Sequence, residues 1–207
     1  MYEKQGSNDI YEIRENTWRK ATSNRICGMK HGIWQPYFSD LLTEMDKIDP
    51  EIQTNNRFEI WEKIFPNGKH LFMTRRNKIR LAVSWWKAIV SKQWHLGKDE
   101  KAEITNFNDK YDFNAIHHLV MDAAMRETGI EAFFAEAGIV SMTIVYEDFI
   151  RDYEETVRNV LKFLEISDWH QIEIPIPQHQ KLADNISEEW VQRFRSEFQR
   201  DWKIKGW

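Results

Sequence analysis

Two adjacent arginines, Arg75 and Arg76, follow the apolar run HLFMT, and Ser84 comes eight to nine residues later. A guanidinium group presents its N–H donors in a planar fork that matches two oxygens of a phosphate or sulfate. A helix beginning just after the arginines would add backbone amides and a favourable dipole, and Ser84 would add a hydroxyl. These residues predict an anion site. The alternative is that the arginines are solvated or paired with acids elsewhere in the chain.

The predicted anion site needs a strand before the arginines and a helix after them. HLFMT is a continuous apolar run of the kind found in buried parallel strands. Apolar residues then recur near 3.6-residue spacing from Ile79 to Trp94, which predicts a helix with a core stripe. GIVSMTIVY predicts a second buried strand. Ligands of parallel sheets sit beyond the carboxyl ends of the strands, where both arginines would lie.

The remaining elements alternate in type along the chain. RICGMK predicts one more strand, and Ser187 is the expected cap of the last helix. Strands alternating with helices predict an α/β fold with a mainly parallel sheet flanked by helices. No repeat or linker divides the sequence, which predicts a single domain over residues 1–207. The other expected helices are Asp9–Ala21, Pro36–Lys47, Arg57–Phe65, Asp112–Ala137, Asp148–Leu164 and Ser187–Trp202.

Composition excludes several classes of function. The 207 residues carry a net charge of -4, which argues against a nucleic-acid partner. No apolar run approaches the ~18 residues of a membrane span, so no membrane partner is expected. Cys27 is the single cysteine, which favours a reducing compartment, the cytoplasm. No G-x-x-x-x-G-K-[ST] motif occurs, which excludes a P-loop kinase, and no His, Cys or carboxylate cluster predicts a metal.

The stretch RNKIRLAVS, Arg76 to Ser84, resembles the 3′-phosphate-binding segment of sulfotransferases. The chain as a whole is similar to the bacterial trehalose 2-sulfotransferase-like family, and the resemblance spans nearly all 207 residues. It implies a P-loop-NTPase-like sulfotransferase fold. The matching stretches occur in the family's order: ICGMKHGIWQPYFSDLL, AVSWWKAIVSKQWH, YDFNAIHHL, FFAEAGI, VYEDF and KLADNISEEWVQRF.

The resemblance implies transfer of a sulfuryl group from 3′-phosphoadenosine 5′-phosphosulfate to a hydroxyl of a carbohydrate or similar small acceptor. Such a loose, in-line transition state needs cations on the transferring oxygens and a base for the acceptor hydroxyl, but no metal. An arginine at a strand end and Ser84 would clasp the donor's 3′-phosphate. Arg75 lies nine residues before Ser84 and Arg76 lies eight before it, so both remain candidates.

The catalytic candidates are Lys30 and His31. Lys30 matches the lysine of the family's G-x-K segment, which would contact the bridging oxygen or the sulfuryl group. His31 has an intrinsic pKa suited to a general base. Cytosolic sulfotransferases carry K-x-H here, with both side chains on one strand face. In the order Lys-His the two would face opposite sides, so an ordinary partly buried histidine is the alternative.

Three further residues are binding candidates, of which Lys181 is a candidate by resemblance. Lys181 matches a basic family position and would contact the nucleotide; the alternative is a solvated lysine before a helix. Trp34 and Trp94 would line an acceptor cleft, where aromatic faces stack on sugars; the alternative is that they belong to the core.

The family's first strand, its Ser/Gly/Thr-rich phosphosulfate loop and an acidic residue just after the loop have no counterpart in this chain. The expectation is a fold incomplete at the N-terminus, which binds the 3′-phosphate end weakly and transfers little sulfate alone. Two other functions remain open. One is a non-catalytic nucleotide-binding or interaction module, and the other is a nucleic-acid-binding protein. Oligomer formation is possible.

Overall fold

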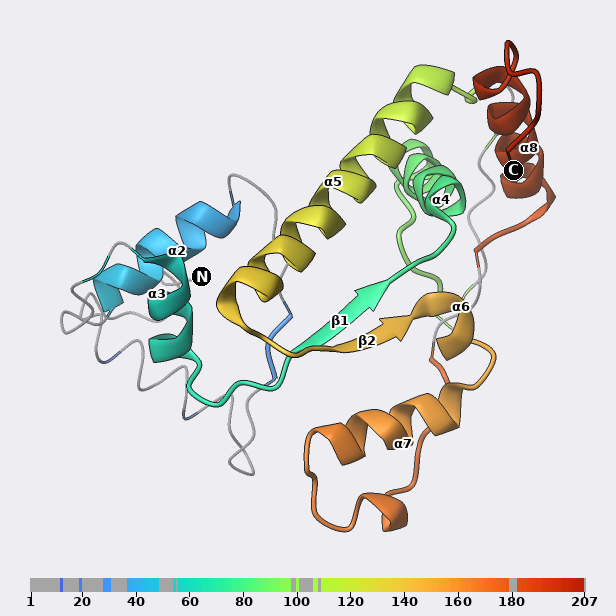
Figure 1. The fold of residues 1–207 in the computed structure, drawn as a ribbon. Helices are drawn as coiled ribbons and strands as arrows, with labels where there is room; N and C mark the ends of the chain where they lie inside the picture. The colour runs from blue at the N-terminus through green and yellow to red at the C-terminus, as the bar shows by residue number, and fades with distance from the viewer. Residues whose placement is uncertain are drawn as a thin grey trace. The chain divides into compact units, whose positions relative to one another are not determined.

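The computed structural model describes residues 12, 19, 28–30, 37–48, 54, 56–97, 100, 106–107, 109–178 and 182–206. The chain clusters into two compact units, one of residues 1–68 and 135–137, the other of residues 69–134 and 138–207. The single domain over residues 1–207 stays a prediction. The described elements run in the order α2 (Tyr37–Ile48), α3 (Arg57–Ile64), β1 (Leu71–Thr74), α4 (Lys78–Ser91), α5 (Phe113–Ala137), β2 (Met142–Val145), α6 (Tyr146–Phe149), α7 (Tyr153–Phe163), the 3₁₀ helix η2 (Trp169–Gln171) and α8 (Asn185–Phe198) (Figure 1).

The first unit contains the helix pair α2 and α3. The rings of Phe38 and Trp61 meet with centroids 5.8 Å apart. Asn56 caps α3, because its side chain accepts a hydrogen bond from the Phe58 amide at 3.0 Å. Both helices confirm the predictions from sequence to within about one residue at each end.

Two other predictions fall in the first unit. The helix expected over Asp9–Ala21 lies almost wholly outside the described residues. The strand expected at RICGMK is wrong for its described end, because Gly28 to Lys30 are exposed and belong to no strand. The run is short, and its apolar residues alone do not supply the neighbouring strand that a ladder needs.

The second unit is built on β1 and β2, which pair in parallel with Leu71 opposite Met142 and Thr74 opposite Val145. Helix α5 covers one face of the pair in Figure 1, and the rings of Phe72 and Phe134 meet there edge to face at 6.2 Å. Helix α7 lies beside β2. The parallel strands and flanking helices confirm the predicted α/β class.

The burial predicted for these strands is wrong. Phe72 and Ile144 are buried, but 40% of Leu71 and 56% of Met73 are exposed. Successive side chains of a strand point to opposite faces, and α5 covers only one of them. Within the described residues the sheet has two strands, so burial alternates.

A second core lies among α4, the start of α5 and α8. Its buried residues are Ile79, Ala82, Val83, Ile116, Trp190, Val191 and Phe194. Helix α4 ends at Ser91, because Lys92 adopts the left-handed conformation with φ 60°. The predicted core stripe is therefore wrong for Trp94, which lies beyond the helix and is 55% exposed.

The predictions for the last helices need two corrections. The helix expected over Asp148–Leu164 is interrupted, since α6 ends at Phe149 and α7 begins at Tyr153. Helix α8 begins at Asn185, so Ser187 is not its cap. Asp184 caps it, accepting from the Ser187 amide at 3.0 Å, and the Ser187 hydroxyl accepts from the Asp184 amide in return. The Asp184 carboxylate lies three residues before the predicted start, and it caps the helix in place of the Ser187 hydroxyl.

Candidate functional site

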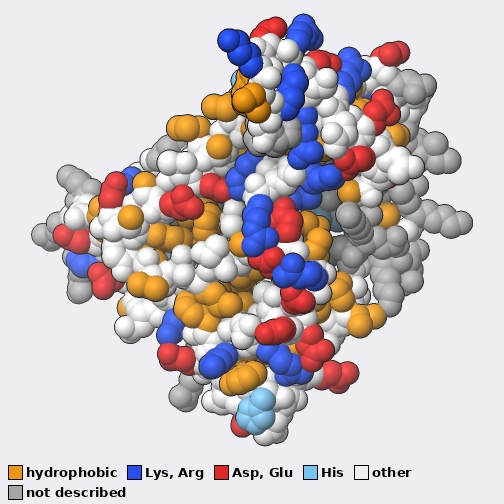
Figure 2. All heavy atoms as spheres, turned by 45° about the vertical axis from the view of Figure 1, so that its right-hand side comes forward, with side chains coloured by type: hydrophobic (Ala, Val, Ile, Leu, Met, Phe, Trp, Pro, Cys, Tyr) orange, Lys and Arg blue, Asp and Glu red, His pale blue; other side chains and the backbone are white. Residues whose placement is uncertain are grey.

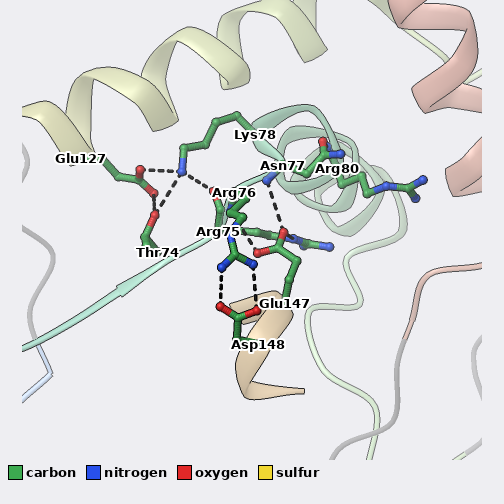
Figure 3. A network of polar contacts seen from close by, with 9 residues as sticks. All are labelled: Thr74, Arg75, Arg76, Asn77, Lys78, Arg80, Glu127, Glu147 and Asp148. Atoms are coloured by element: carbon green, nitrogen blue, oxygen red, sulfur yellow. Dashed lines mark hydrogen bonds and ion pairs between the residues drawn. The ribbon is translucent and has the colours of Figure 1, made fainter. Parts of the chain in front are cut away.

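The two arginines lie where the sequence placed them, between the carboxyl end of β1 and the start of α4. Thr74 at the end of β1 is aligned with Val145 at the end of β2. The first residues of α6 therefore lie beside the arginines, although they are some 70 positions later in the chain. Figure 3 shows the resulting network of acids and bases. Strand register thus brings the acids of the YED tripeptide to the predicted anion site.

Arg76 is held by Asp148. Its Nη1 donates to Oδ1 at 2.9 Å, and its Nη2 donates to Oδ2, which makes the contact bidentate. This hydrogen bonding raises the pKa of Arg76 and lowers the pKa of Asp148. The Arg76 side chain is 60% exposed, and pairs this open to water stabilise a fold little. Both terminal nitrogens of Arg76 are nevertheless already hydrogen-bonded to the Asp148 carboxylate.

Glu147 occupies the amides that precede α4. Its two carboxylate oxygens accept hydrogen bonds from the backbone amides of Arg76 at 3.0 Å and Asn77 at 3.2 Å. Burial alone would raise the pKa of Glu147, but the amide hydrogen bonds and the nearby charge of Arg75 bring it below its ordinary value. Glu147 is therefore a carboxylate bound at the N-terminal end of a helix, the place that favours an anion.

Arg75 is the less occupied of the two arginines. Its guanidinium lies over the ring of Tyr146, 4.6 Å from the centroid. Its Nε is 3.7 Å from Glu147, too far for a hydrogen bond, and is buried without a hydrogen-bond partner among the described residues. The terminal nitrogens of Arg75 form no hydrogen bond with any residue in the described part of the chain. They can therefore take an anion without breaking an existing contact.

Lys78 fastens the end of β1 to α5. Its ammonium lies 2.5 Å from Glu127 and donates to the Thr74 hydroxyl at 3.2 Å and to the Arg75 carbonyl. The Thr74 hydroxyl also donates to Glu127 at 2.9 Å. Both charged side chains are about three-quarters buried or more, at 24% and 21% exposed. The backbone that carries Arg75 is thus fixed from the side opposite to Glu147 (Figure 3).

Ser84 is not brought to the arginines. Asn77 caps α4 by accepting from the Arg80 amide at 3.0 Å, so the helix begins at Lys78. Ser84 then lies about 10 Å along the helix axis from Asn77. Its side chain is exposed. An anion shared with Ser84 would need an arginine side chain reaching back along α4.

Ser84 instead lies between two ion pairs that join α4 to the first turn of α8. Arg80, four residues before Ser84, is 2.6 Å from Glu188. Lys87, three residues after Ser84, is 2.6 Å from Asp184. These spacings place all three on one face of α4.

Lys87 is the most enclosed of these cations. Its side chain is 12% exposed. Besides Asp184, it contacts the Leu182 carbonyl and the Ser187 hydroxyl, each at 3.2 Å, and the ring of Phe107. Burial alone would raise the pKa of Asp184, but hydrogen bonds from Lys87 and Ser187 lower it. Lys87 therefore fixes the segment that leads into α8.

Of the other predicted site residues, the structure describes only Lys30 and Trp94. Lys30 is exposed and Trp94 is exposed beyond α4. His31, Trp34 and Lys181 lie outside the described residues. Their roles stay predictions.

Sequence reasoning missed the part that Glu147, Lys78 and Glu127 play around Arg75. Glu147 belongs to the tripeptide of Tyr146 to Asp148. The signal that could have connected it to the arginines was its position directly after the second apolar run. Parallel neighbouring strands end at the same edge of a sheet.

Comparison with known proteins places these residues in a family. The model of the Stf0 sulphotransferase family matches residues 4–197. The trehalose 2-sulfotransferase of Mycolicibacterium smegmatis is 30% identical over 127 residues, and that of Mycobacterium tuberculosis is 31% identical over 126 residues. Each match covers 61% of this chain and 45% of the relative, so the chain matches less than half of each relative's length. The family model covers most of the chain, and the chain belongs to the Stf0 sulphotransferase family.

Proposed function

We propose that this chain serves sulfuryl transfer from 3′-phosphoadenosine 5′-phosphosulfate to a hydroxyl of a carbohydrate, and that it binds the 3′-phosphate end of the donor. The observation that carries the proposal is Arg75, a guanidinium at the carboxyl end of β1 whose terminal nitrogens are free of hydrogen bonds to described residues. Family membership supports the reaction class.

The residues around Arg75 fit a phosphate. The buried Nε without a partner is costly to leave unsatisfied. The Glu147 carboxylate, 3.7 Å from Nε, offsets part of that cost by its charge, and an anion would meet the terminal nitrogens instead. The Tyr146 ring backs the planar face of the cation. Of the two candidate arginines, Arg75 is therefore the proposed phosphate ligand, and Arg76 the residue that ties the turn to Asp148. Ser84 is retained as a ligand for an anion lying along α4.

The donor, when bound, supplies a sulfuryl group on an already activated leaving phosphate, so no metal is proposed. In the described part of the chain no group of three or more His, Cys, Asp or Glu side chains is placed to hold a metal ion. Lys30, His31 and Lys181 are the proposed partners of the reacting end and of the nucleotide. Lys30 and Lys181 are assigned by the resemblance, and His31 by the intrinsic pKa of an imidazole.

A sugar acceptor is proposed because the two similar proteins are named trehalose 2-sulfotransferases. Trp94 has an exposed ring that could stack on a sugar face, and Trp34 remains its proposed companion. No helix within the described ranges is long and apolar enough to cross a membrane. The lone Cys27 supports a cytoplasmic location.

The charge distribution favours a nucleotide over a nucleic acid. On the face shown in Figure 2, Lys and Arg side chains form a band in which Asp and Glu side chains are interspersed. Arg75 and Arg76 themselves lie beside acids, Glu147 and Asp148 respectively. A surface that tracks a polyanion needs an unbroken basic groove, whereas one phosphate needs one open cation.

The proposal is tested by calorimetric titration of the purified chain with adenosine 3′,5′-bisphosphate and, in parallel, with a single-stranded oligonucleotide. Micromolar affinity for the bisphosphate and none for the oligonucleotide is the expected result. The reverse preference would contradict it. The acceptor is tested with labelled donor and a panel of trehalose, peptides and aryl amines. Label appearing only on peptides or amines would refute a carbohydrate acceptor.

A further inference from the structure

Arg75 is contacted on two sides by consecutive residues of α6. The Tyr146 ring lies against the face of its guanidinium, 4.6 Å from the guanidinium carbon. The Glu147 carboxylate approaches the Nε edge at 3.7 Å. Neither residue contacts the terminal nitrogens through a hydrogen bond. The two contacts restrict the plane of the guanidinium and leave one edge open.

Glu147 also fixes the backbone on which Arg75 is carried. One carboxylate oxygen accepts from the Arg76 amide at 3.0 Å and the other from the Asn77 amide at 3.2 Å. The oxygen on the Asn77 amide is also the one nearest to Arg75 Nε. This arrangement needs two acceptor oxygens. A glutamine at position 147 would offer one oxygen and turn an NH₂ group toward a backbone N–H.

We propose that Glu147 is a positioning residue for the donor-nucleotide site, holding the turn between β1 and α4 and orienting Arg75 so that its terminal nitrogens meet the anion. The inference rests on the proposed function, because it assumes that Arg75 is the phosphate ligand. Glu147 would change the affinity for the nucleotide by orienting Arg75, without contacting the nucleotide itself.

The competing role is that Glu147 blocks the site. A carboxylate bound to the amides at a helix start resembles a bound anion, so an incoming phosphate would have to displace it. The two roles predict opposite effects when the charge is removed. Loss of a negative charge next to an anion site should strengthen anion binding by electrostatics alone. If Glu147 positions Arg75, the same change weakens binding.

The experiment measures bisphosphate affinity by calorimetry for the full chain and for Glu147→Gln, Glu147→Ala, Arg75→Ala and the double variant R75A/E147Q. Glu173→Gln is the matched control, because Glu173 is exposed and the substitution changes net charge identically. Thermal unfolding of each variant is recorded in parallel. The affinity of each variant is calculated from the concentration of folded protein. A loss of stability alone is then not counted as a loss of binding.

We expect E147Q and E147A each to weaken binding about 10-fold, which lies within the range of coupling between residues in contact. E173Q should stay within about twofold of the unchanged chain, since distant surface charges are screened. In the R75A background, E147Q should have little further effect, because Glu147 acts through Arg75.

Unchanged or tighter binding by E147Q would overturn the inference and favour the blocking role. So would equal losses from E147Q with and without Arg75, which would indicate a purely structural effect. These outcomes leave the proposed function standing if R75A still loses affinity. Absence of bisphosphate binding by the unchanged chain would overturn both.

Discussion

The guanidinium of Arg75 lies 4.6 Å from the centroid of the Tyr146 ring. The two residues come from the ends of neighbouring parallel strands, because Arg75 follows β1 and Tyr146 follows β2 directly. The contact shields one face of a cation whose side chain is only 19% exposed. The ring thereby holds the plane of the guanidinium, whose terminal nitrogens remain open to an anion.

The ring of Tyr146, and not its hydroxyl, should matter for binding. We expect Tyr146→Leu to weaken bisphosphate affinity about 2- to 30-fold, which corresponds to a cation–π contact of roughly 0.5–2 kcal/mol. Tyr146→Phe keeps the ring and serves as the control. Calorimetric titration of both variants tests this. A loss in Tyr146→Phe as large as that in Tyr146→Leu would show that the hydroxyl carries the effect.

Removal of the Lys87 ammonium should destabilise the second unit. Lys87→Met keeps the apolar stem but removes the donor to the Leu182 carbonyl and one of the donors to the Asp184 carboxylate, which keeps Ser187. We expect a loss of about 1–3 kcal/mol in the free energy of unfolding, toward the lower end because Asp184 is 48% exposed. Chemical denaturation measures it. Lys203→Met, at an exposed lysine, is the control. An equal loss of unfolding free energy in Lys203→Met would contradict the stabilising role assigned to Lys87.

The stability of the chain should fall in acid. The pKa values of Glu147, Asp148 and Asp184 are all lowered in the fold. Carboxylates with a lowered folded pKa stabilise the protein above their unfolded pKa, near 4, and lose that contribution as pH falls through the folded value. The free energy of unfolding should therefore decline below about pH 5. Denaturation curves from pH 7 to pH 3 test this. The free energy of unfolding of Asp184→Asn should fall less steeply with decreasing pH than that of the unchanged chain. Equal slopes for both proteins would contradict the assignment to Asp184.

Local sequence was sufficient for the positions of most described elements. The helix α4 begins where Asn77 can accept from the Arg80 amide, and both strands are the apolar runs that periodicity indicates. Burial was less predictable. Apolar composition does not reveal how many faces of a strand are covered, so Met73 was expected in the core and is 56% exposed.

The partners of the site residues could not be read from the sequence. Arg76 and Asp148 are 72 positions apart, and only the register of β1 against β2 brings them together. The same register gives Glu147 access to the amides before α4. Arginine and acid side chains are abundant in the chain, and residue type alone does not select among the possible pairs.

The central claim, that Arg75 is the phosphate ligand while Arg76 ties the turn to Asp148, is tested most directly by the affinities of Arg75→Ala and Arg76→Ala for adenosine 3′,5′-bisphosphate. One charge-assisted contact is worth roughly 1.5–3 kcal/mol, so Arg75→Ala should bind about 10- to 150-fold more weakly. Arg76→Ala should bind the bisphosphate only a few-fold more weakly, because an exposed ion pair contributes little to the stability of a turn. A larger loss from Arg76→Ala than from Arg75→Ala, or no loss from either, would contradict the account.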